Sequence, residues 1–241
     1  MKKLYLEDSY LKEFTATVQE VNNDKFVVLD KTAFYQKSGG QPHDTGTIRN
    51  ESGEEFKVVF VGNFDGQISH EIDKPGLKAN ETVYCMLDWE RRHTCMRYHT
   101  AMHILTRIIE QETGAKITGN QINLDYGRVD FNLENFNKEQ MFSYADKFNA
   151  MIKENRPVNT YFLTRDEAMK DPSLFTLENV LPPEVEKIRV VDIENFDKSA
   201  CGGTHVQNTS EIGSMEIYKV ENKGKSNRRL YFRLSNLNNV S

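Results

Sequence analysis

Two pairs of possible metal ligands, each spaced four residues apart, carry the clearest chemical signal in this sequence. His99 and His103 lie in a segment with helical periodicity, so both imidazoles project from one face of that helix. Cys201 and His205 flank two glycines, which permit a tight turn that brings thiolate and imidazole together. Three imidazole nitrogens and one sulfur form a ligand set suited to Zn²⁺. Together the two pairs predict a zinc site.

Each pair alone also fits histidines that only hydrogen-bond within the fold, and from the residues alone both interpretations stay open. Cys95, four residues before His99, is a weaker candidate than Cys201 because no flexible loop adapts its geometry. Cys85 lies inside an apolar strand and is predicted to be a core thiol. The other histidines have no partner at ligand spacing and are interpreted as surface or core residues: His43, His70 and His93.

Four protein ligands make a closed site of the structural type, whereas a catalytic zinc usually keeps a position for water or substrate. One of the four candidates is displaced, or the metal is five-coordinate, or the metal mainly positions a substrate group. The sequence leaves these three alternatives open.

A loop from Thr32 to Pro42 is a second dense group of polar residues. Two glycines give its backbone freedom, Gln41 offers an amide and Thr32 a hydroxyl. It lacks the Gly-Lys-Ser/Thr ending of a phosphate-binding loop. It is either an ordinary connection between strands or a loop that supplies polar contacts to a site on another domain.

The C-terminal hairpin is basic within an acidic chain. The 241 residues contain 31 Lys and Arg against 36 Asp and Glu, and the net charge of −5 argues against a protein that coats nucleic acid by charge alone. Between Lys219 and Arg233, however, six basic residues stand against one acidic residue, for a net charge of +5. Such a hairpin is either a solvated surface or a contact for phosphates.

The elements that must position these residues change type near residue 89. Short strands separated by Gly, Asn and Asp turns are predicted at 14–21, 25–30, 55–61, 67–72 and 82–88, as in a small β-barrel or sandwich. Helical spacing of Met102, Leu105, Ile108 and Ile109 then predicts a helix over 92–113. The fold class is therefore α+β, with a β-barrel domain at 1–89 and an α+β domain at 90–241.

The second domain carries further start and stop signals. Asn137 is predicted to cap a helix over 138–155 whose apolar stripe is Met141, Ala145, Phe148 and Ile152. Thr164 and Glu167 form a capping-box pattern that opens a short helix. A break is expected at Pro182-Pro183, a strand over 189–196, and a hairpin of 214–221 with 228–234.

The whole-chain pattern excludes several classes of protein. No run approaches the roughly 18 apolar residues of a membrane-spanning helix. The start MKKLYLEDSY has no apolar region like that of a secretory signal peptide. Three cysteines cannot all pair, so we interpret them as reduced thiols and expect a cytoplasmic protein.

These motifs together resemble the freestanding alanyl-tRNA editing proteins of the AlaX family, which share a fold with the editing domain of alanyl-tRNA synthetase. The similarity covers about residues 10–235. The motifs are T-x-F-Y-x-x-x-G-G-Q-P at Thr32–Pro42, R-x-x-x-H-T-A-x-H-I-L ending at Leu105, the segment Gly119–Phe131, C-G-G-T-H-V at Cys201–Val206, and the hairpin ending in Arg228-Arg229-Leu230.

The resemblance implies a zinc-dependent hydrolase that removes serine, and as a second substrate glycine, from alanine-specific tRNA. It implies His99, His103, Cys201 and His205 as the zinc ligands and a β-barrel that carries the glycine-rich loop. An alanine pocket rejects glycine and serine weakly, so a second hydrolytic site raises fidelity. The expected tRNA contacts are Lys223, Lys225, Arg228 and Arg229.

Two residues of the loop are assigned catalytic roles as hypotheses. The Thr32 hydroxyl would bond the hydroxyl of serine, and alanine would leave it unpaired at a cost of about 1–3 kcal/mol. Gln41 would help to place the reacting group. Because the chain starts with barrel strands, we expect no amino-acid activation and no use of ATP.

Two other functions fit the same residues. The first is a nonenzymatic, zinc-stabilised RNA-binding module, which the closed ligand set favours. The second is a zinc hydrolase that acts on another ester or on free aminoacyl compounds. The resemblance extends to the editing domain of threonyl-tRNA synthetase, which removes serine from the threonine tRNA, but the barrel with its Gly-Gly-Gln loop favours the alanine branch.

Overall fold

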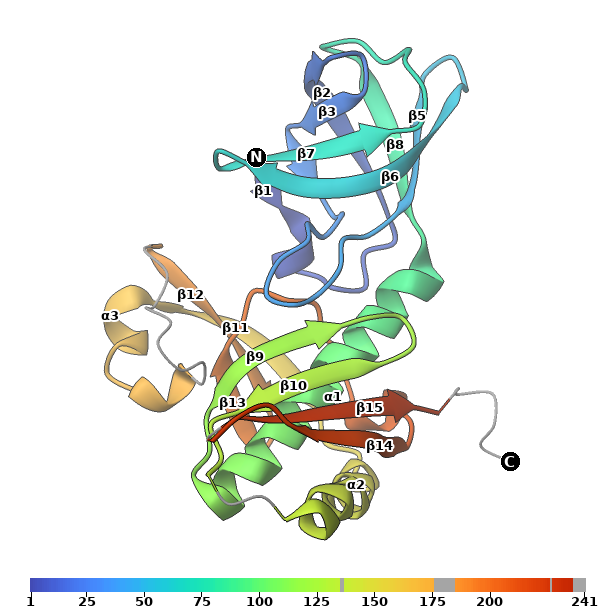
Figure 1. Ribbon diagram of the computed structural model, residues 1–241. Coiled ribbons are helices and arrows are strands. Elements are labelled where there is room, and N and C mark those ends of the chain that lie inside the picture. The colour runs from blue at the N-terminus through green and yellow to red at the C-terminus, as the bar shows by residue number, and fades with distance from the viewer. Residues whose placement is uncertain (135–136, 176–184, 226, 236–241) are drawn as a thin grey trace. The chain divides into compact units, whose positions relative to one another are not determined.

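The computed structural model describes residues 1–134, 137–175, 185–225 and 227–235. It divides into two compact units, Met1–Cys95 and Met96–Ser241, and the division falls inside the helix α1, Trp89–Thr113 (Figure 1). Strands predominate and helices are few, so the predicted α+β class is confirmed. In the described part of the chain, no helix is both long and apolar enough to cross a membrane.

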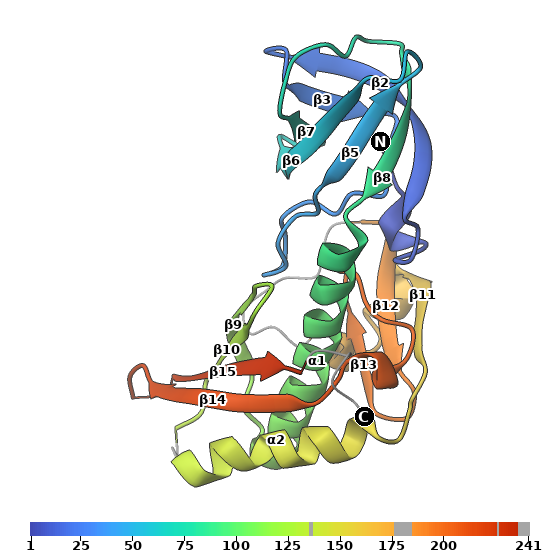
Figure 2. The same cartoon turned by 90° about the vertical axis from the view of Figure 1, so that its right-hand side faces the viewer.

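The first unit is built on six antiparallel strands whose pairing closes in the order β2-β3-β7-β6-β5-β8 (Figure 2). Buried residues alternate with exposed ones along β2, where Phe14, Ala16 and Val18 point into the core. The six strands are β2 (Glu13–Asn22), β3 (Phe26–Leu29), β5 (Gly46–Asn50), β6 (Glu55–Phe64), β7 (Gln67–Ile72) and β8 (Thr82–Leu87). Outside this ring, β1 (Lys2–Lys3) pairs in parallel with β4 (Lys31–Thr32), and Leu4–Leu6 forms a 3₁₀ turn.

The five strands predicted in this unit are all present, and Cys85 is a buried core thiol as predicted. The sequence did not indicate β5, which begins at a glycine. A Cβ atom at Gly46 would lie 2.1 Å from the carbonyl oxygen of Met86 on β8, so only glycine lets these two strands approach.

His70 on β7 is a fully buried histidine that stays neutral. Its Nδ1 lies 2.9 Å from the carbonyl oxygen of Val27 and its Nε2 lies 2.8 Å from Oγ1 of Thr32. Burial lowers the pKa of His70 to about 4, although the hydrogen bond to Val27 acts in the opposite direction.

This histidine should make stability depend on pH. The unfolded chain takes up a proton below about pH 6.5 and the folded chain only below about pH 4, so lowering the pH through this range favours unfolding. We expect the free energy of unfolding to fall by about 3 kcal/mol between pH 6.5 and pH 4 on this account and to level off below it. Urea unfolding of the wild type and of His70→Gln at several pH values measures the difference. An equal pH dependence in both proteins would contradict the assignment.

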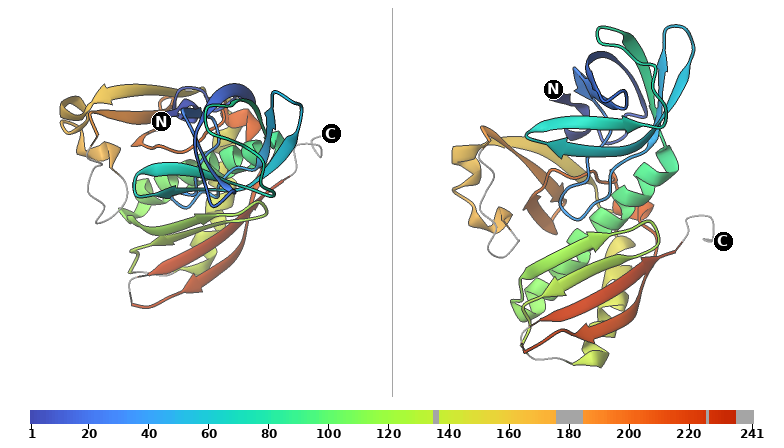
Figure 3. Two further views of the ribbon diagram at one scale, coloured as in Figure 1. Left: turned by 90° about the horizontal axis from the view of Figure 1, so that it is seen from above. Right: turned by 45° about the horizontal axis from the view of Figure 1, so that its top comes forward.

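The second unit combines a four-stranded sheet, order β14-β15-β10-β9, with a three-stranded sheet, order β11-β12-β13. Two helices pack on the four-stranded sheet (Figure 3): Tyr98 of α1 contacts Phe232 of β15, and Asn149 of α2 bonds the backbone of Met215 on β14. The remaining elements are β9 (Ile117–Ile122), β10 (Gly127–Phe131), α2 (Lys138–Ile152), β11 (Val158–Thr164), α3 (Arg165–Ala168), β12 (Lys187–Ile193), β13 (Asp197–Ala200), β14 (Met215–Asn222) and β15 (Arg228–Leu234). Pro172–Leu174 and Thr209–Glu211 are 3₁₀ turns.

The two predicted helix caps are confirmed, α1 begins three residues before its predicted start, and one apolar stripe is corrected. The side chain of Asn137 accepts from the backbone N–H of Gln140, and Thr164 forms the predicted capping box with Glu167. In α2, however, the buried residues are Met141, Tyr144, Phe148 and Met151, whereas Ala145 and Ile152 are only half-buried. The buried face is therefore rotated from the predicted one, because the large side chains of Tyr144 and Met151 are buried in place of those of Ala145 and Ile152. The predicted break at Pro182-Pro183 lies outside the described residues.

Candidate metal centre

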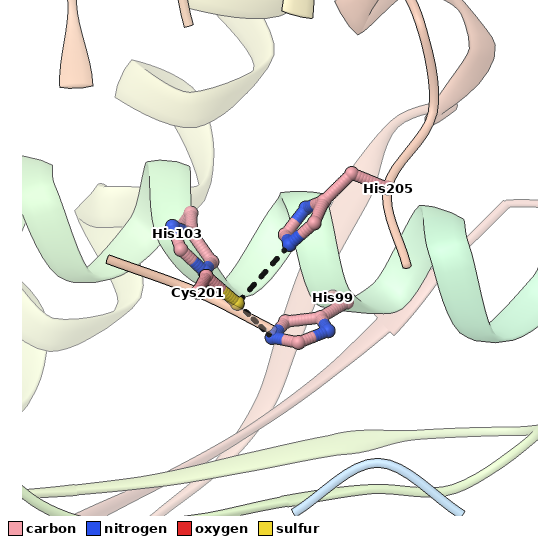
Figure 4. Close-up of side chains that lie close together, drawn as sticks. All are labelled: His99, His103, Cys201 and His205. Carbon is pink, nitrogen blue, oxygen red and sulfur yellow. Dashed lines mark hydrogen bonds between the residues drawn. The ribbon is translucent and has the colours of Figure 1, made fainter. Parts of the chain in front are cut away.

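Four side chains from one helix and one loop of the second unit converge on one point (Figure 4). His99 and His103 project from one face of α1, as their spacing predicts. Cys201 follows the end of β13, and His205 lies four residues further along the same loop. One ligand atom of each residue lies within 4.8 Å of those of the other three.

The distances fit a tetrahedral ion. Sγ of Cys201 lies 3.4 Å from Nε2 of His205 and 3.6 Å from Nε2 of His99. With Zn–N near 2.0 Å and Zn–S near 2.3 Å, a tetrahedron places sulfur and nitrogen about 3.5 Å apart. Borderline-soft nitrogen and sulfur donors with this separation match Zn²⁺ better than Mg²⁺ or Ca²⁺, which prefer oxygen.

A buried arginine shapes the loop that carries the thiol. Nη1 of Arg189 on β12 donates to the carbonyl oxygens of Cys201 and Gly203, each at 2.9 Å. The backbone N–H of Cys201 donates in return to the carbonyl oxygen of Arg189 at 3.0 Å. The backbone N–H of Gly203 points at Sγ of Cys201 from 3.4 Å, as expected for a thiolate acceptor.

The electrostatics of the cluster favour a deprotonated thiol. Burial raises the pKa of Cys201, but the neighbouring His99 and His205 outweigh burial and hold that pKa well below its usual range. Burial and the charge of His99 hold the pKa of His205 well below its usual range, so this ring is neutral. Burial alone would lower the pKa of His103, but hydrogen bonds to Asp197 and Cys201 raise it to about 10. The thiolate is a metal ligand without further activation.

The other thiols and histidines lie outside this group. Among the residues the structure describes, the four-residue cluster contains none of Cys85, Cys95, His43, His70 and His93. Cys95 is fully buried, and burial raises its pKa to about 12, so it is a poor source of thiolate. This supports the preference for Cys201 over Cys95.

The glycine-rich loop belongs to the first unit and is tightly held there. Ser38 and Gln41 exchange backbone hydrogen bonds of 3.2 and 2.9 Å around Gly39 and Gly40, whose φ values are +57° and +83°. Two successive positive φ values are the mark of a type I′ turn, which requires glycine here. Gln41 is 1% exposed.

Thr32, also in the first unit, has a hydroxyl with defined donor and acceptor roles. Because a carbonyl only accepts, Nδ1 of His70 must donate to Val27, and the neutral ring leaves Nε2 as an acceptor. The Thr32 hydroxyl therefore donates to His70 and accepts from the backbone N–H of Phe34 at 3.1 Å. A further partner of this oxygen must be a donor.

The four predicted tRNA contacts differ sharply in their surroundings. Arg228 is 4% exposed and donates to backbone carbonyls of its own hairpin, including those of Gly224 and Lys225. Arg229 forms a two-bond ion pair with Asp130, at 2.7 and 2.8 Å. Lys223 and Lys225 are exposed, and Lys223 also pairs with Glu221 at 3.0 Å.

Comparison with family models identifies two segments. Residues 188–231 match the threonyl and alanyl tRNA synthetase second additional domain, and residues 5–91 match the class II (A) tRNA synthetases. The first match contains Cys201 and His205, and the second contains the glycine-rich loop.

Several named proteins are similar over nearly the whole chain. The alanyl-tRNA editing protein AlaX-M of Methanosarcina acetivorans is 51% identical over 239 residues, covering 96% of this chain and 98% of that protein. The protein of the same name from Saccharolobus solfataricus is 42% identical, with the same two coverages. The alanine–tRNA ligase of Thermococcus kodakarensis is 39% identical over 236 residues, which make up 25% of that ligase.

Proposed function

We propose that this chain, which belongs to the AlaX-M family of alanyl-tRNA editing proteins, hydrolyses the ester that joins a wrong amino acid to alanine-specific tRNA. Water adds its oxygen to the ester carbonyl carbon, and the ribose oxygen leaves with a proton. The products are the free amino acid and uncharged tRNA. The observation that carries the proposal is the convergence of three imidazoles and a thiolate in a chain of this family.

His99, His103, Cys201 and His205 would hold a Zn²⁺ ion. When bound, the ion would supply Lewis-acid chemistry, by activating water or by anchoring the amino group of the substrate. The chain's own contribution is a cluster that is already assembled, with its loop bonded to Arg189, so we expect little reorganisation on binding.

We propose separate roles for the domains at 1–89 and 90–241. The second domain holds the metal, and the first contributes the glycine-rich loop. Gln41 would help to place the reacting group. Thr32 would accept a hydrogen bond from the serine hydroxyl, the one role that its bonds to His70 and Phe34 leave open.

Thr32→Val tests the selection of serine. Alanine brings no hydroxyl, so we expect the variant to lose about tenfold or more of its preference for seryl- over alanyl-tRNA, the equivalent of one hydrogen bond. Steady-state deacylation of both substrates measures the ratio. Thr17 is a half-buried threonine elsewhere in the same unit, so Thr17→Val is the control. It should keep the wild-type ratio of seryl- to alanyl-tRNA deacylation. An unchanged ratio in Thr32→Val would refute the assignment.

We propose that the exposed Lys223 and Lys225 contact tRNA phosphates. Arg228 and Arg229 would support this contact by stabilising the hairpin, through the bond of Arg228 to the carbonyl oxygen of Gly224 and the ion pair of Arg229 with Asp130. A substrate of this kind is made and used in the cytoplasm, where we propose that the protein works. Hydrolysis of an ester needs no activation of the amino acid, so we propose that the reaction uses no ATP.

One assay separates the proposed function from its alternatives. The protein is incubated with Ser-, Gly- and Ala-charged alanine tRNA and with Ser-charged threonine tRNA, with and without a chelator. We expect rapid release of serine, release of glycine, little release of alanine, and loss of activity with chelator. Deacylation that ignores tRNA identity indicates a general esterase, and no deacylation with chelator-induced unfolding indicates a zinc-stabilised binding module.

A further inference from the structure

A threonine next to one ligand of the cluster fixes the proton of another. Oγ1 of Thr100 lies 2.9 Å from the carbonyl oxygen of Met96 and 3.1 Å from Nδ1 of His205. The carbonyl can only accept, so the single hydroxyl hydrogen goes to Met96. The hydroxyl oxygen must then accept from His205, whose Nδ1 carries the ring hydrogen. Thr100 is fully buried, and the backbone N–H of Val206 also points at its oxygen, from 3.3 Å.

An aspartate does the same for a second ligand. Oδ2 of Asp197 lies 3.3 Å from Nδ1 of His103. An ionised carboxylate only accepts, so Nδ1 of this ring is again the donor. Arg107 donates to Oδ1 at 2.8 Å and Ser199 to Oδ2 at 2.9 Å, which fix the orientation of the carboxylate. Asp197 is 4% exposed, so these bonds are shielded from water.

The two contacts have one consequence for the cluster. A histidine that binds a metal ion gives up its second proton, and in the resulting neutral imidazole a hydrogen on Nδ1 leaves the lone pair on Nε2. Nε2 of His205 is the atom that faces Sγ of Cys201 in Figure 4. The side chains that bond Nδ1 therefore decide which nitrogen is offered to the centre of the cluster.

We propose that Asp197 and Thr100 are positioning residues that hold His103 and His205 in the Nδ1–H tautomer, so that both present Nε2 to one metal ion. This inference rests on the metal centre of the proposed function. The two residues differ in strength. The carboxylate makes a charge-assisted bond that also raises the basicity of its histidine, whereas the hydroxyl mainly orients the ring.

The test measures zinc affinity of the full-length protein by competition with a chelator of known affinity, without tRNA. Loss of such an outer contact typically costs 10–100-fold in metal affinity. We expect Asp197→Ala to weaken zinc binding by about 30–100-fold and Thr100→Val by about tenfold, with Thr100→Ser close to the wild type. Asp197→Asn keeps an acceptor but loses the charge and should fall between the wild type and Asp197→Ala.

Two controls are matched to these variants. Thr106→Val makes the same change on the same helix, but the Thr106 hydroxyl donates to the backbone carbonyl of His103 and not to its ring. Ser199→Ala removes a neighbour of Asp197 and leaves its contact with His103 in place. Both should bind zinc within about threefold of the wild type.

Long-range ¹⁵N–¹H spectra of the zinc-loaded protein show directly which ring nitrogen carries the hydrogen. A purely structural role of Asp197 and Thr100 would not determine this position. We expect a hydrogen on Nδ1 of His103 and His205 in the wild type, with altered signals in Asp197→Ala and Thr100→Val. Unchanged zinc affinity in both variants, or a hydrogen on Nε2 in the wild type, would overturn the inference. Because neither readout involves deacylation, a zinc-binding protein with these tautomers but no editing activity would contradict only the proposed function.

Discussion

Replacing Cys201 with alanine should remove bound zinc and lower the deacylation of seryl-tRNA by at least about a hundredfold. The thiolate supplies the only negative charge among the four ligands, and its pKa is held low by the histidines around it. Structural zinc sites bind with about 10–16 kcal/mol in total, so an average ligand accounts for roughly 3 kcal/mol, equivalent to more than a hundredfold in affinity. His99→Ala should act in the same way.

The metal content of the purified protein and the rate of deacylation are measured together. Cys85→Ala is the matched control, because this thiol is buried in the core of the other unit, outside the cluster. It should keep its zinc and its activity while losing about 1 kcal/mol of stability. A Cys201→Ala protein that retains full activity without zinc would contradict the proposed chemistry.

Thermal melting of the same variants addresses the structural alternative. The cluster ties α1 to the loop after β13, so zinc loss should lower the melting temperature of Cys201→Ala. If the variant stays folded and inactive, the metal acts in the reaction. If the variant unfolds and the wild type shows no deacylation, the closed ligand set serves only to stabilise the fold.

The sequence predicted elements whose patterns are local and missed those that depend on distant contacts. The capping residues and the apolar periodicity of α1 were sufficient to place the helices. The hairpin β9–β10 lacks such a pattern, because its strands carry polar residues and two glycines. The reason for Gly127 is visible only in the fold: a Cβ atom there would lie 2.2 Å from the Phe232 ring.

The same distinction applies to the candidate site. The spacing of His99 and His103 was enough to place both on one helix face. The spacing of Cys201 and His205 around two glycines was enough to predict them as the other two ligands. Asp197 and Arg189 carry no motif, since their roles arise where β12 and β13 pair beside α1. The surroundings of Arg228 could not be predicted either: this cation in a basic run is buried and bonded to the backbone of its own hairpin.

Breaking the buried ion pair between Arg92 and Asp44 should cost the first unit more stability than any other single polar contact discussed above. Both side chains are 0% exposed, and Nε of Arg92 lies 3.1 and 3.0 Å from the two carboxylate oxygens. The guanidinium also donates to the carbonyl oxygens of Ser9 and Ala33. The carboxylate accepts a further bond from the backbone N–H of Tyr35 at 2.6 Å.

Removing one partner of a buried ion pair leaves the other charge buried without compensation, which lowers the free energy of unfolding by about 3–5 kcal/mol. We expect Arg92→Met to lose this amount, because the Asp44 carboxylate loses its charged partner and the carbonyl oxygens of Ser9 and Ala33 lose the donors of Arg92. Asp44→Asn keeps an acceptor for Tyr35 and should lose less. Arg91→Met is the matched control: its guanidinium makes one bond, to the carbonyl oxygen of His43, and its loss should cost below about 1 kcal/mol.

Urea unfolding of the single variants and of the Arg92→Met/Asp44→Asn double variant completes a thermodynamic cycle. We expect the double variant to be less destabilised than the sum of the two singles by about 2 kcal/mol, since each single change strands the same partner. The carboxylate also bonds the backbone of Tyr35 within the glycine-rich loop, so activity should fall in the variants that remain folded. Additive losses would show that the two charges are satisfied independently, and that the loop does not depend on the pair.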